Sequence, residues 1–263
     1  MFVDSHCHLD FPGLRERVEE VVARARAVGV ERIVTIATRR SAWEEAIALC
    51  ERFPEVFCAL GVHPHQAASE GLEDVEPLCA ACRHPKVVAV GEAGLDYHYD
   101  RAPRERQLAN FRAHIEAARQ TGLPLVVHTR NADEDTAELL EEEMERGHFT
   151  GVIHCFSSSR ALATRALAIG FFFGIGGILT FRRSDELRRI VAELPTDRLL
   201  LETDAPYLAP EPCRGRTNEP ALLVHTAGML ARLKGVAVEE VGRITTAAFD
   251  RLFWKARVQR CGS

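Results

Sequence analysis

The sequence predicts an α/β fold in which eight parallel strands close into a single barrel with helices around it. Short β-branched and apolar runs alternate with longer amphipathic runs along the chain, which is the pattern of parallel α/β proteins. Runs such as PLVVH and GFFFGIGG are almost continuously apolar, as suits strands buried on both faces of a sheet. The length of 263 residues also fits one such barrel, which typically has about 250 residues.

The expected elements follow one another without interruption. We expect strands at residues 2–8, 32–37, 56–62, 87–91, 123–128, 151–156, 170–175 and 198–203. Amphipathic helices are expected between them at 14–27, 42–52, 105–120, 133–145, 160–169 and 185–194, followed by a helical tail over 220–233 and 238–253. No linker, charge block or internal repeat beyond this βα alternation divides the chain. We therefore interpret residues 1–263 as one domain.

Composition narrows the function classes. The formal net charge is −5, so the chain lacks the overall basic surface that drives non-specific binding to nucleic acids. No segment approaches the roughly 18 apolar residues of a membrane span, and the N-terminus lacks the pattern of a signal peptide. The eight cysteines are scattered, which favours a reduced protein over a disulfide framework. We expect a cytoplasmic monomer with no membrane association.

Polar side chains gather where the expected strands end, and six of the eleven histidines are among them. In a barrel of this kind the carboxyl ends of the strands form the rim that carries the chemistry. The residues are His6 and His8 on strand one, His63 and His65 after strand three, Glu92 and Asp96 after strand four, His128 and Arg130 at strand five, His154 at strand six, and Glu202 and Asp204 at strand eight.

Six of these residues form a donor set for divalent cations. In an extended strand alternate side chains share a face, so His6 and His8 point the same way while Cys7 points to the other face. A single histidine at such a position is more often an ordinary core residue, but six donors on one rim exceed coincidence. Imidazole and carboxylate suit divalent cations such as Mg²⁺, Mn²⁺ or Zn²⁺. The predicted ligands are His6, His8, Glu92, His128, His154 and Asp204.

The number of donors predicts two ions rather than one. A catalytic zinc normally takes three protein ligands and a water, so six ligands fit two ions that share a bridging carboxylate. Glu92, central in the order, is the predicted bridge. A carboxylated lysine is another way to bridge two ions in a barrel, but Lys86 precedes the fourth strand, and Lys234 and Lys255 lie in late helices.

Such a centre is suited to hydrolysis. Two divalent ions polarise a phosphoryl oxygen and lower the pKa of a bound water toward about 7. Asp204 can ligate an ion and also accept the proton of the attacking water, so it is the predicted general base. His63, His65 and Arg130 lie on the same rim and are predicted to hold a phosphate group. Ordinary loop packing is the alternative for these three.

The motifs resemble those of the TatD family of metal-dependent deoxyribonucleases. The matching segments are DSHCHLDF, ALGVHPH, VAVGEAGLDY, LPLVVHTRNA, GVIHCFSSS and LLLETDAPYLAP, followed by RGRTNEP. The resemblance implies a TIM-like (β/α)8 barrel of the metal-dependent hydrolase type, with the ligands named above. It also implies 3′→5′ trimming of DNA with magnesium or manganese, and contact of His63 and His65 with the substrate phosphate.

The leading hypothesis is therefore a two-metal phosphodiesterase that acts on DNA ends, which we expect to be single-stranded. The acidic net charge suits an enzyme that holds only a few terminal nucleotides. A first alternative is a hydrolase of another ester, such as an aminoacyl-tRNA or a small molecule, which would use the same centre. A second alternative is a catalytically idle barrel that serves as an interaction protein, although the complete donor set argues against it.

Four further features are interpreted as structural. The CAAC segment at Cys79–Cys82 has no partner pair for a zinc site, and Cys7 and Cys155 are expected to pack within the barrel. The charged segment Arg182–Arg189 is expected to be a solvated helix surface rather than a DNA contact. The glycines of GFFFGIGG do not have dinucleotide-loop spacing and are expected to permit tight turns.

Overall fold

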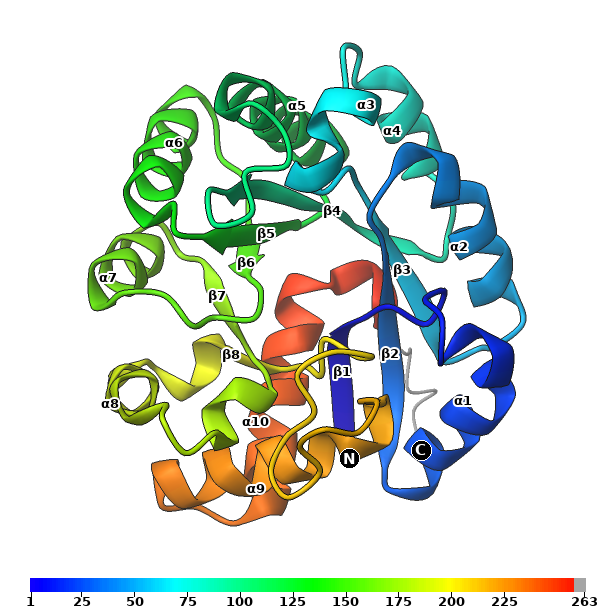
Figure 1. Ribbon diagram of the computed structural model, residues 1–263, viewed down its shortest axis with the longest axis vertical. Helices are drawn as coiled ribbons and strands as arrows, with labels where there is room; N and C mark the ends of the chain where they lie inside the picture. Colours follow the sequence, from blue (N-terminus) through cyan, green and yellow to red (C-terminus); the bar gives the residue numbers. More distant parts are fainter. Residues whose placement is uncertain (258–263) are drawn as a thin grey trace.

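The computed structural model describes residues 1–257, which form a ring of eight parallel strands surrounded by helices (Figure 1). Each strand pairs with the next one in chain order. The predicted fold class is confirmed. The strands are β1 (Phe2–Cys7), β2 (Val30–Ala37), β3 (Val56–Leu60), β4 (Val87–Asp96), β5 (Leu125–Arg130), β6 (Gly151–Ile153), β7 (Phe172–Ile175) and β8 (Leu199–Leu201).

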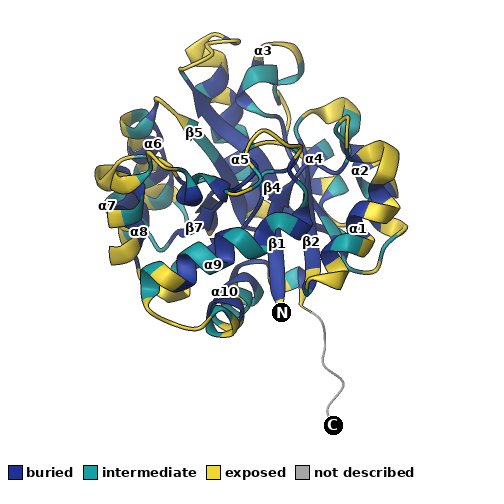
Figure 2. Ribbon diagram, turned by 60° about the horizontal axis from the view of Figure 1, so that its bottom comes forward, coloured by how far each residue is buried: buried dark blue, intermediate teal, exposed yellow. Residues whose placement is uncertain are grey.

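The helices lie around the outside of the ring, except that the last one lies across one end of it. Each helix has one buried and one exposed face (Figure 2). Predicted helix ends agree within a few residues, except that 14–17 and 220–222 contain 3-10 turns instead of α-helix. The helices are α1 (Val18–Ala27), α2 (Trp43–Glu51), α3 (Ala67–Glu70), α4 (Glu76–Ala81), α5 (Arg104–Thr121), α6 (Asp133–Arg146), α7 (Arg160–Ala168), α8 (Asp185–Glu193), α9 (Leu223–Lys234) and α10 (Val238–Leu252).

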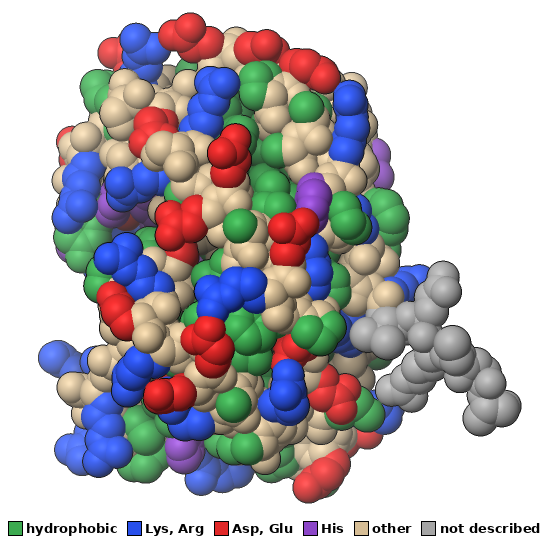
Figure 3. Space-filling model, turned by 90° about the vertical axis from the view of Figure 1, so that its right-hand side faces the viewer, with side chains coloured by type: hydrophobic (Ala, Val, Ile, Leu, Met, Phe, Trp, Pro, Cys, Tyr) green, Lys and Arg blue, Asp and Glu red, His purple; other side chains and the backbone are tan. Residues whose placement is uncertain are grey.

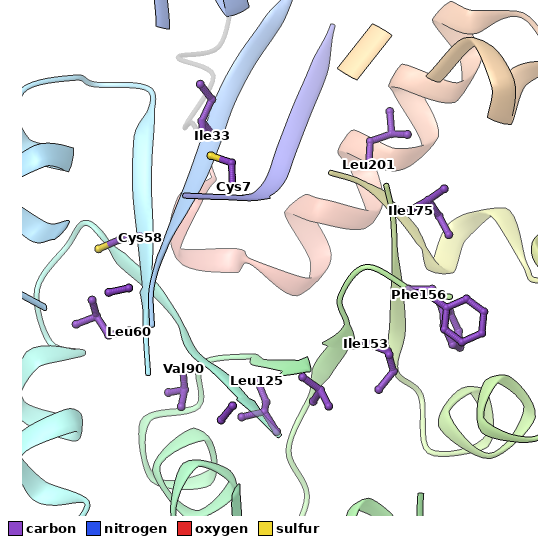
Figure 4. Packing of buried hydrophobic residues seen from close by; sticks show 14 of the residues in the cluster. Cys7, Ile33, Cys58, Leu60, Val90, Leu125, Ile153, Phe156, Ile175 and Leu201 are labelled. Carbon is purple, nitrogen blue, oxygen red and sulfur yellow. The ribbon is translucent and has the colours of Figure 1, made fainter. Parts of the chain in front are cut away.

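Two apolar layers hold the barrel together. The larger layer fills the space between the strands and the outer helices, and it includes Cys7, Ile33, Leu125 and Leu201 (Figure 4). The smaller layer lies inside the ring, where residues such as Val34 from several strands contact one face of α10. Helix α10 therefore closes the end of the barrel at which the strands begin, and burial of its apolar face stabilises the fold.

The polar residues at the carboxyl ends of the strands follow the apolar interior residues in the same alternation. Val126, Val152 and Leu200 belong to the interior cluster. Two residues further along the chain in each case are His128, within β5, and His154 and Glu202, just beyond the ends of β6 and β8. Because side chains alternate with a period of two in a strand, these polar groups lie directly above the apolar interior.

The seam between β8 and β1 is held largely by side chains. Ser5 Oγ donates to the Leu201 carbonyl at 3.0 Å, and the buried Asp4 carboxylate accepts from the Thr203 amide at 2.9 Å and the Thr203 hydroxyl at 2.6 Å. Just beyond the strand ends, the Asp204 amide donates to the His6 carbonyl at 2.9 Å. These bonds fix β1 beside the loop after β8, so residues almost 200 positions apart in sequence share one site.

Several strands end at other positions than predicted, with β3, β6 and β8 ending two or three residues earlier and β5 two residues later. The apolar run of β4 stops at Gly91, but the strand continues to Asp96 through a register irregularity against β5. Gly94 makes this extension feasible, since its φ is +148° and a Cβ there would lie 1.9 Å from the His128 carbonyl oxygen. In contrast, β6 and β8 are shorter than predicted. His154 and Asp204 therefore lie on loops, next to or at residues with left-handed φ, +46° at Cys155 and +56° at Asp204.

No single helix within residues 1–257 has both the length and the apolar composition of a membrane span. By these two criteria the pair Pro220–Lys234 and Val238–Leu252 passes together, but it bends by 102° between its two parts.

Candidate metal centre

A pocket of about 530 Å³ opens at the end of the barrel where the strands finish. Every predicted site residue except His6 lines it, and His6 lies fully buried behind its wall. A second, more open hollow beside α2 contains none of the predicted site residues. The predicted residues that line the pocket are His8, His63, His65, Glu92, His128, Arg130, His154 and Asp204.

Glu92 is the centre of the arrangement, and its two carboxylate oxygens face different groups. Oε2 lies 3.6 Å from His6 Nε2. Oε1 lies 2.9 Å from His128 Nδ1 and 2.8 Å from His154 Nε2. The carboxylate is almost fully buried, so it offers each side one oxygen with little competition from solvent.

The Oε2 side contains His6 of β1, His8 directly after this strand, and Asp204. Asp204 Oδ1 is 3.6 Å from His6 Nε2 and 3.4 Å from His8 Nε2, and the two imidazole nitrogens are 3.4 Å apart. His6 and His8 do share a face, as predicted, while Cys7 packs between β1 and the outer helices. His6, His8 and Glu92 bring one ligand atom each within 4.8 Å of one another.

The Oε1 side contains the histidines of β5 and the loop after β6. His128 Nδ1 and His154 Nε2 are 3.3 Å apart, and both are within 3 Å of the same Glu92 oxygen. The ring of His154 also stacks on that of His6, with centroids 4.0 Å apart. The two sides are thus neighbouring halves of one site that share the Glu92 carboxylate.

The outer ring nitrogens of two histidines face acceptors. His8 Nδ1 lies 3.3 Å from the Ile36 carbonyl, which can only accept, so His8 Nε2 presents its lone pair to the centre. His128 has a carboxylate oxygen at each ring nitrogen, with Nε2 at 3.1 Å from Asp96 Oδ2 and Nδ1 at 2.9 Å from Glu92 Oε1. With an ion bound at Nδ1, Asp96 would accept the proton on Nε2. A carbonyl or carboxylate behind a ligating imidazole is the usual arrangement in metal sites.

In His63 the nitrogen that faces the centre carries the proton. Its Nδ1 accepts the amide of His65 at 3.1 Å, so the proton of the neutral ring is on Nε2. That nitrogen lies 3.5 Å from Glu92 Oε1, and His63, Glu92 and His128 form a set with potential ligand atoms within 4.8 Å. Because Nε2 carries the proton, His63 is placed as a hydrogen-bond donor rather than a ligand. This favours the predicted contact with a substrate anion.

Asp96 has a larger part in the site than the sequence indicated. Its Oδ2 contacts His65 Nε2 at 2.9 Å and His128 Nε2 at 3.1 Å. Its Oδ1 accepts the amides of His98 and Tyr99, both at 3.0 Å. Asp96 therefore links a predicted ligand to a predicted phosphate contact. The GEAGLD motif contained Asp96, but its partners depend on the extension of β4 that sequence alone did not reveal.

Glu202 is a second residue whose role the sequence alone does not predict. It is fully buried, and its Oε1 accepts the Cys155 amide at 2.6 Å and lies 3.6 Å from His154 Nδ1. Its other oxygen has no hydrogen-bond partner among the described residues. Gly174 of β7 makes room for it, because a Cβ there would lie 2.0 Å from Glu202 Oε2. The expectation that the GFFFGIGG glycines permit turns therefore misses the close approach at Gly174.

The electrostatics of the centre favour an anionic bridge among histidines. Burial opposes ionisation of Glu92, but His154, His63 and His128 outweigh it and hold its pKa well below the usual value. Burial, reinforced by His154, also lowers the pKa of His6 well below its usual range. Burial also disfavours the charged form of His154, but the nearby carboxylates of Glu92 and Glu202 outweigh burial and raise the pKa of His154. A cation would therefore compete with a proton for His154, as in metal sites generally.

The donor set fits divalent cations. Imidazole nitrogens converge on a buried carboxylate, and the sets of potential ligand atoms found within residues 1–257 contain no thiol. A further set of His6, His154 and Glu202 also brings ligand atoms within 4.8 Å. His154 Nδ1 and Glu202 Oε2 are buried without a hydrogen-bond partner within residues 1–257. Which of these residues ligate, and how many ions they hold, stays a prediction.

Comparison with known proteins identifies the family. Residues 3–254 match the family model described as TatD related DNase. This chain belongs to the TatD family. A relative described as the uncharacterized metal-dependent hydrolase YcfH of Escherichia coli strain K12 is 42% identical, over 95% of this chain and 95% of that protein. YabD of Bacillus subtilis, with the same description, is 38% identical over 96% of this chain and 99% of its own length.

Solved structures agree with the family assignment. The crystal structure of YJJV, a TatD homolog from Escherichia coli K12, superposes with a TM-score of 0.88 and 33% sequence identity, covering 96% of this chain and 97% of that one. This TatD protein is accordingly a metal-dependent hydrolase with the barrel architecture of its family.

The remaining predicted features lie away from the chemistry. Cys79 and Cys82 are buried free thiols at the end of α4, which fits packing. In the Arg182–Arg189 segment, Arg188 donates to the carbonyls of Leu179 and Phe181 and pairs with Asp185. Lys86 lies at the opposite end of the barrel, where its ammonium donates to three backbone carbonyls. It is thus absent from the centre, as inferred from its position in the sequence.

Proposed function

We propose that this TatD protein is a phosphodiesterase that removes nucleotides from the 3′ end of single-stranded DNA, with two divalent ions bridged by Glu92. The observation that carries the proposal is the division of the Glu92 oxygens between two groups of donors. Hydrogen-bond donors and arginines line the same pocket, where a phosphate would meet the bridge. The description of the matching family as TatD related DNase supports the choice of substrate.

The distances around Glu92 support a division of the ligands between two ions. His6, His8 and Asp204 would hold one ion with Glu92 Oε2, and His128 and His154 would hold the other with Glu92 Oε1. Bound divalent ions in such a centre supply Lewis acidity, which lowers the pKa of water and neutralises charge on a phosphoryl oxygen.

The protein residues position the phosphate and move the proton. His63 Nε2–H and Arg130 donate to the non-bridging phosphate oxygens, and His65 holds the same side of the pocket through its contact with Asp96. Asp204, partly exposed to the pocket, accepts the proton of the attacking water. As water attacks phosphorus, the bond to the 3′-oxygen of the preceding nucleotide breaks, and the proton passes to that leaving oxygen. The products are a 5′-mononucleotide and a shortened strand.

The charge distribution suits an enzyme that acts on strand ends. On the face formed by α1, α2 and α4, basic and acidic side chains are interspersed without a band of one sign (Figure 3). With the net charge of −5, this arrangement disfavours tight binding along a duplex, which needs many cationic contacts to phosphates. Arginines near the metal centre can instead hold a few terminal phosphates. Arg39, Arg101 and Arg130 line the pocket.

The test uses a 5′-labelled single-stranded DNA oligonucleotide and protein stripped of metal. Mg²⁺, Mn²⁺ or Zn²⁺ is added back separately, and Glu92→Gln is the matched control because it keeps the shape of the side chain. We expect a ladder of progressively shorter labelled products that requires metal and disappears in the variant.

Other outcomes separate the alternatives. Uptake of about two ions per chain without a ladder would rule out the nuclease and leave hydrolysis of another ester, such as an aminoacyl-tRNA, as the activity of the centre. Failure to take up any metal would overturn the metal centre itself and favour an idle barrel.

A further inference from the structure

Two exposed tyrosines stand on the rim of the metal centre and have no part in the proposed reaction. Tyr99 is 49% exposed and Tyr207 is 54% exposed, and both line the pocket. The other large apolar side chains that are exposed within residues 1–257, such as Trp254, do not line it. Exposed aromatic rings beside a pocket are typical of surfaces that contact a bound ligand.

Tyr207 forms an aromatic wall with Phe11 beside His8. The ring of Tyr207 meets Phe11 edge-on at 6.1 Å and His8 at 6.4 Å, while Phe11 stacks on His8 at 4.5 Å. The backbone under Tyr207 is fixed, because the side chain of the buried Asn218 donates to the Tyr207 carbonyl at 2.6 Å and to the Thr203 carbonyl at 2.8 Å. The ring is therefore presented in a set position next to a predicted ligand, with half of its surface open to solvent.

Tyr99 has a different environment on the histidine side of the pocket. Its ring meets His65 edge-on at 5.4 Å. The guanidinium groups of Arg130 and Arg101 lie 4.8 Å and 5.3 Å from its centroid. Cation–π contacts of this kind hold arginines in place while leaving their N–H groups free to donate. This wall is therefore cationic, whereas the Tyr207 wall is neutral.

We propose that the two walls hold a DNA strand on either side of the metal centre, with the terminal base stacked on Tyr207 and the preceding phosphate bound by Arg101, beside Arg130 at the scissile phosphate. The inference rests on the proposed function and names the residues that select a strand end. The difference in charge between the walls decides on which side the free end of the strand lies. The terminal nucleoside has no further phosphate and suits the neutral Tyr207 wall, whereas the rest of the strand has one phosphate per nucleotide and suits the cationic wall. Stacking on a tyrosine accepts any base, so sequence-independent trimming is expected.

The first experiment follows release of the first nucleotide from two labelled strands, using the metal-loaded enzyme. The strands differ only at the 3′ terminus, which carries either an ordinary nucleotide or an abasic tetrahydrofuran residue with the same phosphate. Tyr207→Ala should raise KM for the ordinary strand by about tenfold or more, the range expected for loss of one stacked base. The abasic strand should be a poor substrate for wild type, and Tyr207→Ala should change its KM by less than about twofold.

Two controls separate stacking from damage to the centre. Tyr207→Phe keeps the aromatic face and should retain the wild-type KM on both strands. Wild-type kcat in Tyr207→Ala would show that the neighbouring His8 is undisturbed. An equal effect of Tyr207→Ala on both strands, or no effect on either, would overturn the assignment of the base to this wall.

The second experiment tests the cationic wall by binding, without any need for cleavage. A fluorescent phosphorothioate oligonucleotide, which resists hydrolysis, is titrated into the metal-loaded protein at several salt concentrations. Arg101→Gln should weaken binding and reduce the salt slope by about one unit, as expected for one lost phosphate contact. Tyr99→Leu should weaken binding in the same direction, because Arg101 and Arg130 would lose the ring that holds them.

The two proposals fail in distinguishable ways. If the Tyr207 and Arg101 variants cleave DNA as wild type does, the nuclease proposal stands and the proposed role of the two walls is wrong. Binding that depends on Tyr207 and Arg101, without cleavage under any metal, would support the walls and overturn the nuclease. An oligonucleotide that is neither bound nor cleaved would overturn both.

Discussion

The two ends of the barrel are built from the same strands but contain opposite kinds of side chain. Where the strands begin, the interior holds Val34 and Phe172, and Phe249 of α10 and Phe253 directly after this helix close it. Where the strands finish, the interior holds imidazoles and carboxylates around Glu92. The alternation that buries Val126 at one end places His128 at the other.

This difference indicates that stability and chemistry are separable in this fold. Apolar contacts at the α10 end stabilise the barrel without touching the site, and the polar end is supported from below by a packed interior. Substitutions at the α10 end should therefore change the free energy of unfolding, and substitutions at the pocket end should change metal binding and turnover.

The largest effect is expected at the bridge. In Glu92→Gln the neutral amide replaces one of the two anionic oxygens, so the residue can no longer present a negative oxygen to both groups of donors. Hydrolysis should fall by at least about 10³-fold. The thermal unfolding midpoint of the metal-free variant should move much less than that of a core variant. Activity within about tenfold of wild type would rule out the bridging role.

The second effect should appear only in stability. Phe249 is 1% exposed, stacks on Phe253 at 4.6 Å and carries the guanidinium of Arg32 at 4.9 Å. Phe249→Ala should lower the free energy of unfolding by about 3–5 kcal/mol, measured by denaturant titration. Metal affinity of the folded fraction should stay unchanged. Trp254→Ala, at a half-exposed aromatic on the same end, is the matched control and should cost at most about 1 kcal/mol.

The third prediction concerns Gly174, a strand residue that packs against the buried Glu202 carboxylate behind the metal centre. Ala at position 174 would drive a Cβ into the Glu202 carboxylate, 2.0 Å from Oε2, and displace its contacts with the Cys155 amide and His154. Gly174→Ala should therefore lower metal affinity by about 10–100-fold, the usual cost of disturbing a group behind a ligand. Gly228→Ala, in α9 with open space around the new methyl group, should leave metal affinity unchanged. Equal metal affinities in the two variants would show that Glu202 does not support His154.

Sequence reasoning was most successful where the pattern is local. The position of His6, His8, His128 and His154 at one end of the barrel follows from strand alternation and from the rule that parallel strands finish on one rim. Glu202 was within reach of the same argument, since it is two residues beyond the interior Leu200. The sequence places it on the rim but predicts no role for it, because Asp204, next in the alternation, already supplies a carboxylate.

Other features depend on contacts that no local pattern reveals. The role of Asp96 requires that β4 continue past Gly91 in a specific register with β5, where Gly94 lies opposite His128. The tautomer of His63 depends on the amide of His65 folding back onto its ring. The seam between Asp4 and Thr203 joins residues 199 positions apart. Only the assembled barrel brings these groups together.

The smallest effect is expected at Asp96, which holds two histidines of the polar end in place. Asp96 accepts from His65 and His128 through one oxygen, and burial of this carboxylate is outweighed by His128 and the Tyr99 amide, so its pKa is held below the usual value. Asp96→Asn keeps the shape but removes the charge that orients both rings. We expect metal affinity to fall by about tenfold. A rise in KM for a phosphodiester should accompany this loss, because His65 loses the same partner.

His65→Gln separates the two consequences, because it removes the phosphate-side ring and leaves His128 paired with Asp96. That variant should raise KM while metal affinity, measured by titration of the stripped protein, stays at the wild-type value. If His65→Gln weakens metal binding as much as Asp96→Asn does, His65 acts on the metal centre itself and the predicted division between ligand and phosphate histidines is wrong. If neither variant changes metal affinity, Asp96 orients His65 alone, and the polar end of the barrel is less interdependent than its hydrogen bonds indicate.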